Sequence, residues 1–184
     1  MPQPPHILIA GIGNIFLGDD AFGCEVAQRL LSRPQRQHVR VVDFGIRGLD
    51  LVYALQDGYD LVILIDAVSR DEGPPGTLYL LEPQLTGPIE DALIDPHSLD
   101  PVKVLRTALS LGAKLRKVLL VGCEPATRPD DIDAGEMPPG LSPPVSAAVE
   151  GAVDLVESVL KRFSGACPAD RVLEAQKEAS ACPQ

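Results

Sequence analysis

The feature of this sequence that most constrains its fold is a five-residue apolar run, residues 61–65 (LVILI), which ends in Asp66. A short run that is apolar at every position predicts a central strand of a parallel sheet, because helices cover both faces of such a strand. Asp66 is then a carboxylate at the end of a buried strand, which is costly unless it is paired, hydrogen-bonded or metal-bound. The run therefore predicts a layered α/β architecture with a polar site at one edge of its sheet.

Strands and helices alternate along the rest of the chain. Apolar, β-branched runs predict further strands at residues 6–11, 39–42, 76–81 (nearer an edge) and 117–122. Helical spacing of apolar residues predicts helices over residues 22–34, 49–58, 99–112 and from 143 to Phe163, the last with Ser142 as its N-cap and Pro143 in its first turn. This alternation, without repeats or a linker, predicts a three-layer α/β/α sandwich on a mostly parallel sheet.

Length and charge bound the class of protein. The chain has 184 residues, 45% of them apolar, which suits a single domain over residues 1–163 followed by a polar, disordered tail over 164–184. Twenty-six acidic and sixteen basic residues give a net charge of −10. We therefore expect no general affinity for nucleic acid or membranes, both of which favour a basic surface. The acidic stretch around Asp130 and Glu136 is expected to be a solvated surface loop.

The cysteines and the N-terminus indicate a cytoplasmic protein. The first residues lack the charged and apolar regions of a signal peptide, and every apolar run is too short to cross a bilayer. The four cysteines show no CxxC spacing and are expected to be reduced thiols. Cys24 and Cys123 are predicted to be small buried hydrophobes, whereas Cys167 and Cys182 fall in the polar tail.

Three polar groups fall in loops that can meet beyond the carboxyl ends of the strands, where ligands bind in such sheets. They are Asp19 and Asp20 after the first strand, Asp66, and His97 before a helix. Each has a structural alternative: Asp20 can cap the next helix, Asp66 can cap a turn, and His97 can make one ordinary hydrogen bond. Together, two carboxylates and one imidazole would form an open site suited to nickel or zinc.

Other chemistries lack their signatures. The glycines at positions 11 and 13 begin a GxGxxG pattern, but position 16 is Phe, and no GK[ST] is present, so no nucleotide is expected. There is no GxSxG, no HExxH, and no cysteine beside a plausible histidine base. Any peptide hydrolysis would therefore depend on carboxylate or metal chemistry.

Five blocks of the sequence resemble the hydrogenase maturation peptidases. Residues 11–23 (GIGNIFLGDDAFG) resemble the family's GxGNxxxxD[DE]xxG signature. The later blocks follow in the family's order: 43–48 (DFGIRG) resembles its DxGTxG loop, 65–67 (IDA) its strand-ending DA, 96–99 (PHSL) its PHxL, and 140–143 (GLSP) its GL[ST]P helix start. The resemblance covers nearly the whole domain, from Ile7 to Phe163.

The resemblance implies a twisted five-stranded sheet and an endopeptidase that trims the C-terminal extension of a nickel-loaded [NiFe]-hydrogenase large-subunit precursor. It also implies that Asp20, Asp66 and His97 contact nickel, which the substrate carries; their catalytic roles stay unassigned. Asp20 stands where the family often has Glu, so either Asp19 or Asp20 can face the metal. We expect the protein to act as a monomer on this precursor.

The loop over residues 43–48 and the trio of candidate metal contacts each allow more than one interpretation. The loop over residues 43–48 has Ile46 in place of the family's Thr, followed by Arg47, which can engage a carboxylate or acidic surface of the substrate or can simply be solvated. The same trio would also serve a non-catalytic metal-sensing module that binds a metalloprotein without cutting it. A peptidase of the same fold acting on another protein is the third reading.

Overall fold

A five-stranded sheet forms the centre of the computed structural model, which describes residues 4–85, 100–126 and 140–165. Its strand order is β2-β1-β3-β5-β4. The four parallel strands are β1 (Ile7–Ile12), β2 (Val39–Gly45), β3 (Leu61–Ala67) and β5 (Val118–Cys123), and β4 (Leu78–Leu81) runs antiparallel to β5 at an edge. The predicted mostly parallel sheet is confirmed, with the LVILI run as its central strand.

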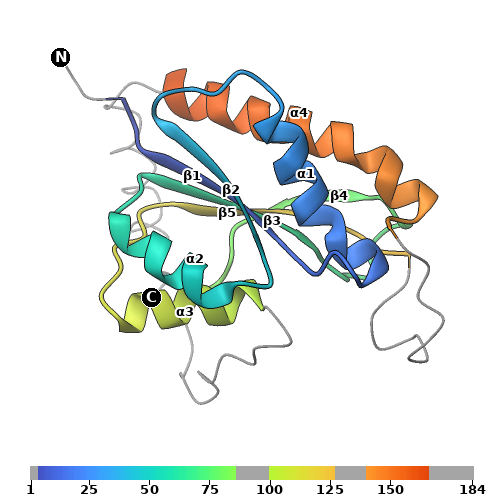
Figure 1. Ribbon diagram of the computed structural model, residues 1–184, viewed down its shortest axis with the longest axis horizontal. Helices are drawn as coiled ribbons and strands as arrows, with labels where there is room; N and C mark the ends of the chain where they lie inside the picture. Colours follow the sequence, from blue (N-terminus) through green and yellow to red (C-terminus); the bar gives the residue numbers. More distant parts are fainter. Residues whose placement is uncertain (1–3, 86–99, 127–139, 166–184) are drawn as a thin grey trace, which may run out of the picture.

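Helices cover both faces of the sheet. Figure 1 shows α1 (Phe22–Leu31) and α4 (Pro143–Gly165) on one face, and α2 (Gly48–Ala54) and α3 (Pro101–Ser110) on the other. Two short 3₁₀ turns, η1 (Gly18–Ala21) and η2 (Leu55–Asp57), precede α1 and follow α2. The three-layer α/β/α sandwich is therefore confirmed. Among the described residues, no helix combines the length and apolarity needed to cross a membrane.

Alternate residues of β3 pack into two separate cores. Ile63 and Ile65 belong to the core under α1 and α4, and Val62 and Leu64 belong to the core under α2 and α3. All four side chains are inaccessible to solvent. This double burial explains why the strand is apolar at every position instead of alternating with polar residues.

The α2 helix forms where apolar spacing predicts it, but two of its apolar residues face away from the core. Leu51 and Val52 are buried against the sheet. Leu49 is 58% exposed and Tyr53 is 68% exposed, and their spacing of four residues places both on one outer side of the helix. The outer side of α2 therefore carries apolar surface that the core does not use.

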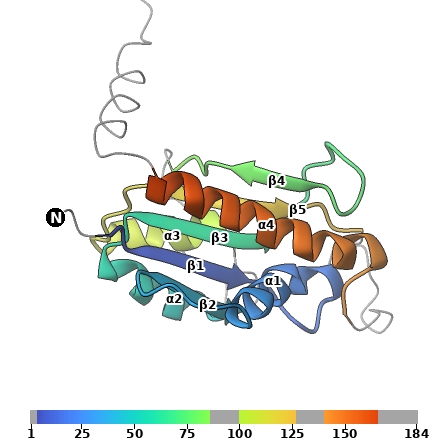
Figure 2. The ribbon, with the colours of Figure 1, turned by 90° about the horizontal axis from the view of Figure 1, so that it is seen from above.

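The topology changes direction between β1 and β3. From β1 the chain passes through α1 to β2 on one side, and from β2 it passes through α2 to β3 on the other side of β1. Figure 2 shows β1, β3 and β5 pointing the same way, with β4 reversed and with the carboxyl ends of the parallel strands beside the start of α1. Such a switch point is where open α/β sheets bind ligands.

Candidate functional site at the switch point

The loop that follows β1 is folded by glycines at positions where a side chain has no room. Gly13 has a φ of +131°, and a Cβ on it would lie 1.8 Å from the carbonyl oxygen of Asp20. A Cβ on Gly23 would lie 2.1 Å from the carbonyl oxygen of Ile65 and 2.2 Å from that of Ile12. The loop and the first turn of α1 can therefore press directly against the ends of β1 and β3.

This close packing makes Asp20 and Asp66 neighbours. Asp20 Oδ2 accepts a hydrogen bond from the backbone N–H of Asn14 at 2.7 Å, and Asp66 Oδ1 accepts one from Ala67 N at 2.9 Å. Burial raises the pKa of Asp20. Burial, and then the negative charge of Asp20, raise the pKa of Asp66 well above its ordinary value. Two adjacent carboxylates that resist ionisation form a site that a cation would stabilise.

A third acid, Asp100, adds to this negative field. Its charge also raises the pKa of Asp66. Its side chain caps α3, because Asp100 Oδ1 accepts hydrogen bonds from the backbone N–H groups of Val102, at 2.8 Å, and Lys103, at 3.4 Å. Within the described residues, the charges that act on Asp66 are thus those of two acids, and Asp100 is a contributor that the sequence analysis did not single out.

Asp19 accepts hydrogen bonds from two other segments of the chain and stabilises the fold. It is 1% exposed. One oxygen accepts the N–H of Ser142 at 2.7 Å, and the other accepts the N–H of Ala126 at 2.8 Å and the hydroxyl of Ser142 at 2.9 Å. Neither η1 nor α1 has a side-chain cap, so the helix-capping alternative for Asp20 was wrong. Of the two adjacent acids, Asp20 is the one beside Asp66.

His97 lies outside the described residues, so its position relative to the carboxylates stays a prediction. Within the described ranges, no group of three metal-ligating side chains is found. Asp20 and Asp66 are the two members of the predicted trio that the structure describes, and their contact with a metal also stays a prediction. The acids around Asp130 and the tail from residue 166 likewise lie outside the described part.

A buried glutamate that the sequence analysis did not single out fixes the connection after β3. Glu124, which follows β5 directly, is 4% exposed. Its carboxylate accepts hydrogen bonds from the backbone N–H groups of Arg70 and Asp71 and, at 2.8 Å, from the hydroxyl of Tyr79. The available signal was the same as for Asp66, a charged residue at the end of a buried strand.

The two described cysteines are buried thiols, as predicted. Burial, followed by the charge of Asp43, raises the pKa of Cys24 to about 12. Burial, followed by the charge of Asp19, raises the pKa of Cys123 to about 12. Both groups stay protonated at neutral pH, so neither is the thiolate that a cysteine peptidase requires.

Arg47 is tied back to its own loop while its side chain stays 60% exposed. The guanidinium donates to the carbonyl oxygens of Phe44 and Asp43 and lies 3.8 Å from the carboxylate of Asp50. It therefore stabilises the end of β2. Its exposed surface faces solvent beside a groove of about 280 Å³ that loop residues 13–16 and 43–47 line.

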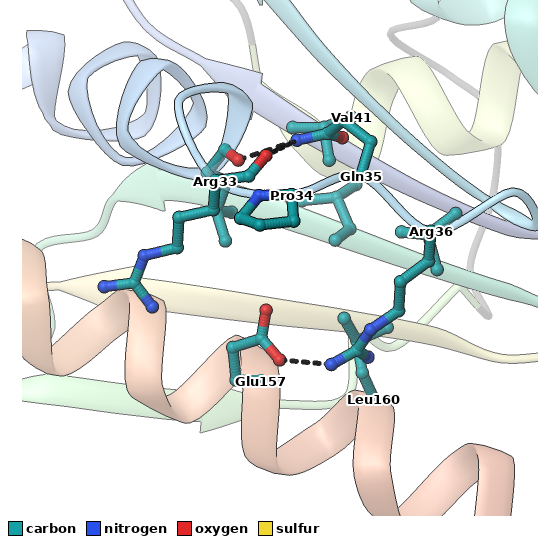
Figure 3. A pocket seen from close by; sticks show the side chains of 10 residues that line it. Arg33, Pro34, Gln35, Arg36, Val41, Glu157 and Leu160 are labelled. Carbon is teal, nitrogen blue, oxygen red and sulfur yellow. Dashed lines mark hydrogen bonds and ion pairs between the residues drawn. The ribbon is translucent and has the colours of Figure 1, made fainter.

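A second cavity, at the opposite end of the sheet, is a structural feature. It lies between the connection from α1 to β2 and the helix α4, and Figure 3 shows Arg36 paired with Glu157 across it. Its volume is about 20 Å³. That space holds about one water molecule, so the cavity is no ligand site.

Comparison with known proteins decides the family. A model of the hydrogenase maturation proteases (HycI) matches residues 24–159. The chain belongs to this family. It is 31% identical over 159 residues to a putative hydrogenase maturation protease of Methanocaldococcus jannaschii, covering 85% of this chain and 97% of that protein. It is 30% identical over 157 residues to the hydrogenase 2 maturation protease of Escherichia coli, covering 85% and 91%.

Solved structures of hydrogenase maturation proteases share the fold. The maturating endopeptidase HybD of E. coli superposes with a TM-score of 0.66 and 28% identity, covering 86% of this chain and 93% of that one. The hydrogenase 2 maturation peptidase of a Thaumarchaeota archaeon superposes with a TM-score of 0.61 and 35% identity, covering 84% and 97%. The chain is therefore a peptidase of the hydrogenase maturation type, as the five sequence blocks indicated.

Proposed function

We propose that this protease removes the C-terminal extension of a [NiFe]-hydrogenase large-subunit precursor, and that it recognises nickel already inserted in that precursor. Asp20, Asp66 and His97 are the residues that contact the metal in this proposal. The observation that carries it is the pair Asp20 and Asp66: burial raises the pKa of both carboxyls, and the charge of Asp20 raises the pKa of Asp66 further.

The pair suits a metal that belongs to the substrate. Two carboxylates and an imidazole bind a borderline ion such as nickel weakly compared with thiolate ligands in a precursor. The site would therefore contact the ion while the precursor keeps it. The positive charge relieves the repulsion that Asp20 and Asp100 exert on Asp66, which links binding to the presence of metal in the substrate.

Two mechanisms are compatible with this arrangement. In the first, the metal in the substrate polarises the scissile carbonyl or a bound water, and the carboxylates hold the substrate in register. In the second, one carboxylate accepts the proton of the attacking water, and the metal only positions the substrate. Contact with a cation would lower the pKa of the carboxylates and so favour the ionised form that the second mechanism requires.

Mass spectrometry of the matching large-subunit precursor tests the proposal. Nickel-loaded and nickel-free precursor are each incubated with the protease, and we expect loss of a short C-terminal peptide from the loaded form alone. Cleavage of both forms would retain the peptidase and remove nickel as the recognition element. Binding without cleavage of a precursor that a known protease processes would favour the non-catalytic metal-sensing module.

A pair of substitutions separates the site from the rest of the surface. Asp66→Asn keeps the shape of the side chain and removes its charge, so cleavage of loaded precursor should fall by at least about 100-fold. Asp154→Asn, an exposed acid on α4, makes the same chemical change away from the site and should leave cleavage unchanged. Full activity of Asp66→Asn would contradict the assignment.

A further inference from the structure

Large apolar side chains are exposed at one side of the candidate site. Phe16 is 81% exposed and Ile15 is 56% exposed in the loop after β1, and Ile46 is 53% exposed in the loop after β2. Leu49 and Tyr53 are exposed on the outer side of α2, the helix that follows the second loop. We call these five side chains the apolar rim. Side chains of this size, gathered on neighbouring segments and left in water, mark an interaction surface.

The apolar rim borders a defined groove. Ile15, Phe16 and Ile46 line the hollow of about 280 Å³ between the two loops. The two loops are joined by a backbone hydrogen bond, in which Gly13 N–H donates to the carbonyl oxygen of Gly45 at 3.2 Å. Two loops joined by a backbone hydrogen bond can keep the groove in place for a ligand.

The groove and the candidate site share one loop. Asn14 lines the groove, and its backbone N–H donates to Asp20 Oδ2 at 2.7 Å. In an endopeptidase the substrate chain extends on both sides of the bond that is cut. A chain that places its metal centre against Asp20 and Asp66 therefore meets the groove within a few residues.

We propose that the apolar rim and its groove seat an extended apolar stretch of the large-subunit precursor next to the cleavage site. The inference rests on the proposed function and adds the chemistry of the contact. The side chains that line the groove select apolar residues, and the backbone of the two loops keeps the stretch in register with Asp20.

Charge favours the precursor over a second copy of this chain as the occupant. Each copy carries a net charge of −10, so pairing two copies brings together surfaces of the same overall sign. A stable dimer also buries about 800 Å² per partner, more than five partly exposed side chains provide. A peptide stretch needs only the groove, because the rest of its protein makes contacts elsewhere.

Steady-state cleavage of the nickel-loaded precursor tests this contact. Phe16→Ser removes the most exposed member of the rim, and kcat/KM should fall about tenfold through KM. Phe16→Leu should retain most of the activity, because an apolar side chain remains. The matched control is Leu111→Ser, which makes the same polar change at a residue that is 61% exposed at the far end of α3 and should leave kcat/KM within about twofold.

The outcomes separate this inference from the proposed function. If the unmodified protease does not cleave the precursor, the proposed function fails. If it cleaves and Phe16→Ser cleaves equally well, the inference fails alone. Thermal melting shows whether Phe16→Ser stays folded, as its exposure predicts. A dimer in analytical ultracentrifugation that Phe16→Ser converts to a monomer would assign the rim to self-association and overturn the inference.

Discussion

Asp19 and Ser142 join the loop after β1 to the start of α4, because the carboxylate accepts both the backbone N–H and the hydroxyl of the serine. The two residues are 123 positions apart in the chain. The backbone N–H of Ala126, in the segment that follows β5, donates to the same carboxylate. One buried acid thus connects three segments directly beside Asp20.

Replacing Asp19 should therefore cost stability. In Asp19→Asn, the amide NH₂ replaces one carboxylate oxygen and faces a backbone N–H group that now donates to that oxygen. This donor loses its acceptor, so we expect the free energy of unfolding to fall by about 2–4 kcal/mol. Ser142→Ala removes only the hydroxyl and should cost about 1 kcal/mol. Urea unfolding of both variants and of the double variant measures these values, and the double loss should be smaller than the sum because the partners are shared. If both single variants lowered the free energy of unfolding by the same small amount, this would contradict the role of Asp19 in connecting the three segments.

The Asp66 carboxyl should make the metal-free protein less stable as pH rises. Its pKa in the folded chain is raised, so the unfolded chain releases the proton at lower pH. The stabilising effect of the neutral form is present below the ordinary pKa near 3.9 and is lost as pH rises through the folded pKa. Asp66→Asn should thus be more stable than the unmodified protein at pH 7.5 and show little gain at pH 4.

Thermal melts of Asp66→Asn and the unmodified protein at the two pH values test this. Each kcal/mol of change in the free energy of unfolding corresponds to roughly 2–4 °C in Tm for a chain of this size. Asp154→Asn, which removes an exposed charge, should show no such pH-dependent gain. A Tm of Asp66→Asn that is equal to or lower than that of the unmodified protein at pH 7.5 would contradict the raised pKa of Asp66 in the folded chain.

Gly13 should not accept any side chain. In Gly13→Ala the Cβ would lie 1.8 Å from the carbonyl oxygen of Asp20, so the loop must move and Asp20 with it. We expect a loss of about 3 kcal/mol or more together with loss of cleavage. Gly58→Ala is the control, because Gly58 has a φ of +72° and open space around it and should cost only about 1–2 kcal/mol. Chemical denaturation and the cleavage assay compare the two.

Cys24 and Cys123 should resist alkylation in the folded protein. With a pKa of about 12, each is a thiolate in only about one molecule in ten thousand at pH 8, and both side chains are buried. Iodoacetamide treatment followed by peptide mapping should label them only after denaturation. Rapid labelling of Cys24 in the folded state would show that the loop after β1 opens to solvent.

The fold could be predicted from sequence because its signals are local. The unbroken apolar run of β3 and the four-residue spacing of Phe22, Val26 and Leu30 each indicate an element without reference to the rest of the chain. The sequence also placed Asp66 at the end of a buried strand. The role of Asp19 was not predictable in this way, because its partners Ser142 and Ala126 are brought close only by the completed fold.

Which apolar side chains of α2 are exposed to solvent was equally hard to predict. Leu49 and Tyr53 have the spacing of a core-facing stripe, but Leu51 and Val52 occupy the side of α2 that meets the sheet. Which of two apolar sides is buried depends on where neighbouring strands lie, and residue type alone does not contain that information. The apolar rim is therefore a product of the structure.

The repulsion between Asp20 and Asp66 has a consequence for the order of hydrogenase assembly. Hydrolysis of a peptide bond is not reversed under cellular conditions, so a cut made before the metal arrives would waste the precursor. Under the proposed function, an empty precursor offers nothing that offsets the like charges at the switch point, whereas a loaded one does. The protease would then act as a checkpoint whose criterion is a single positive ion.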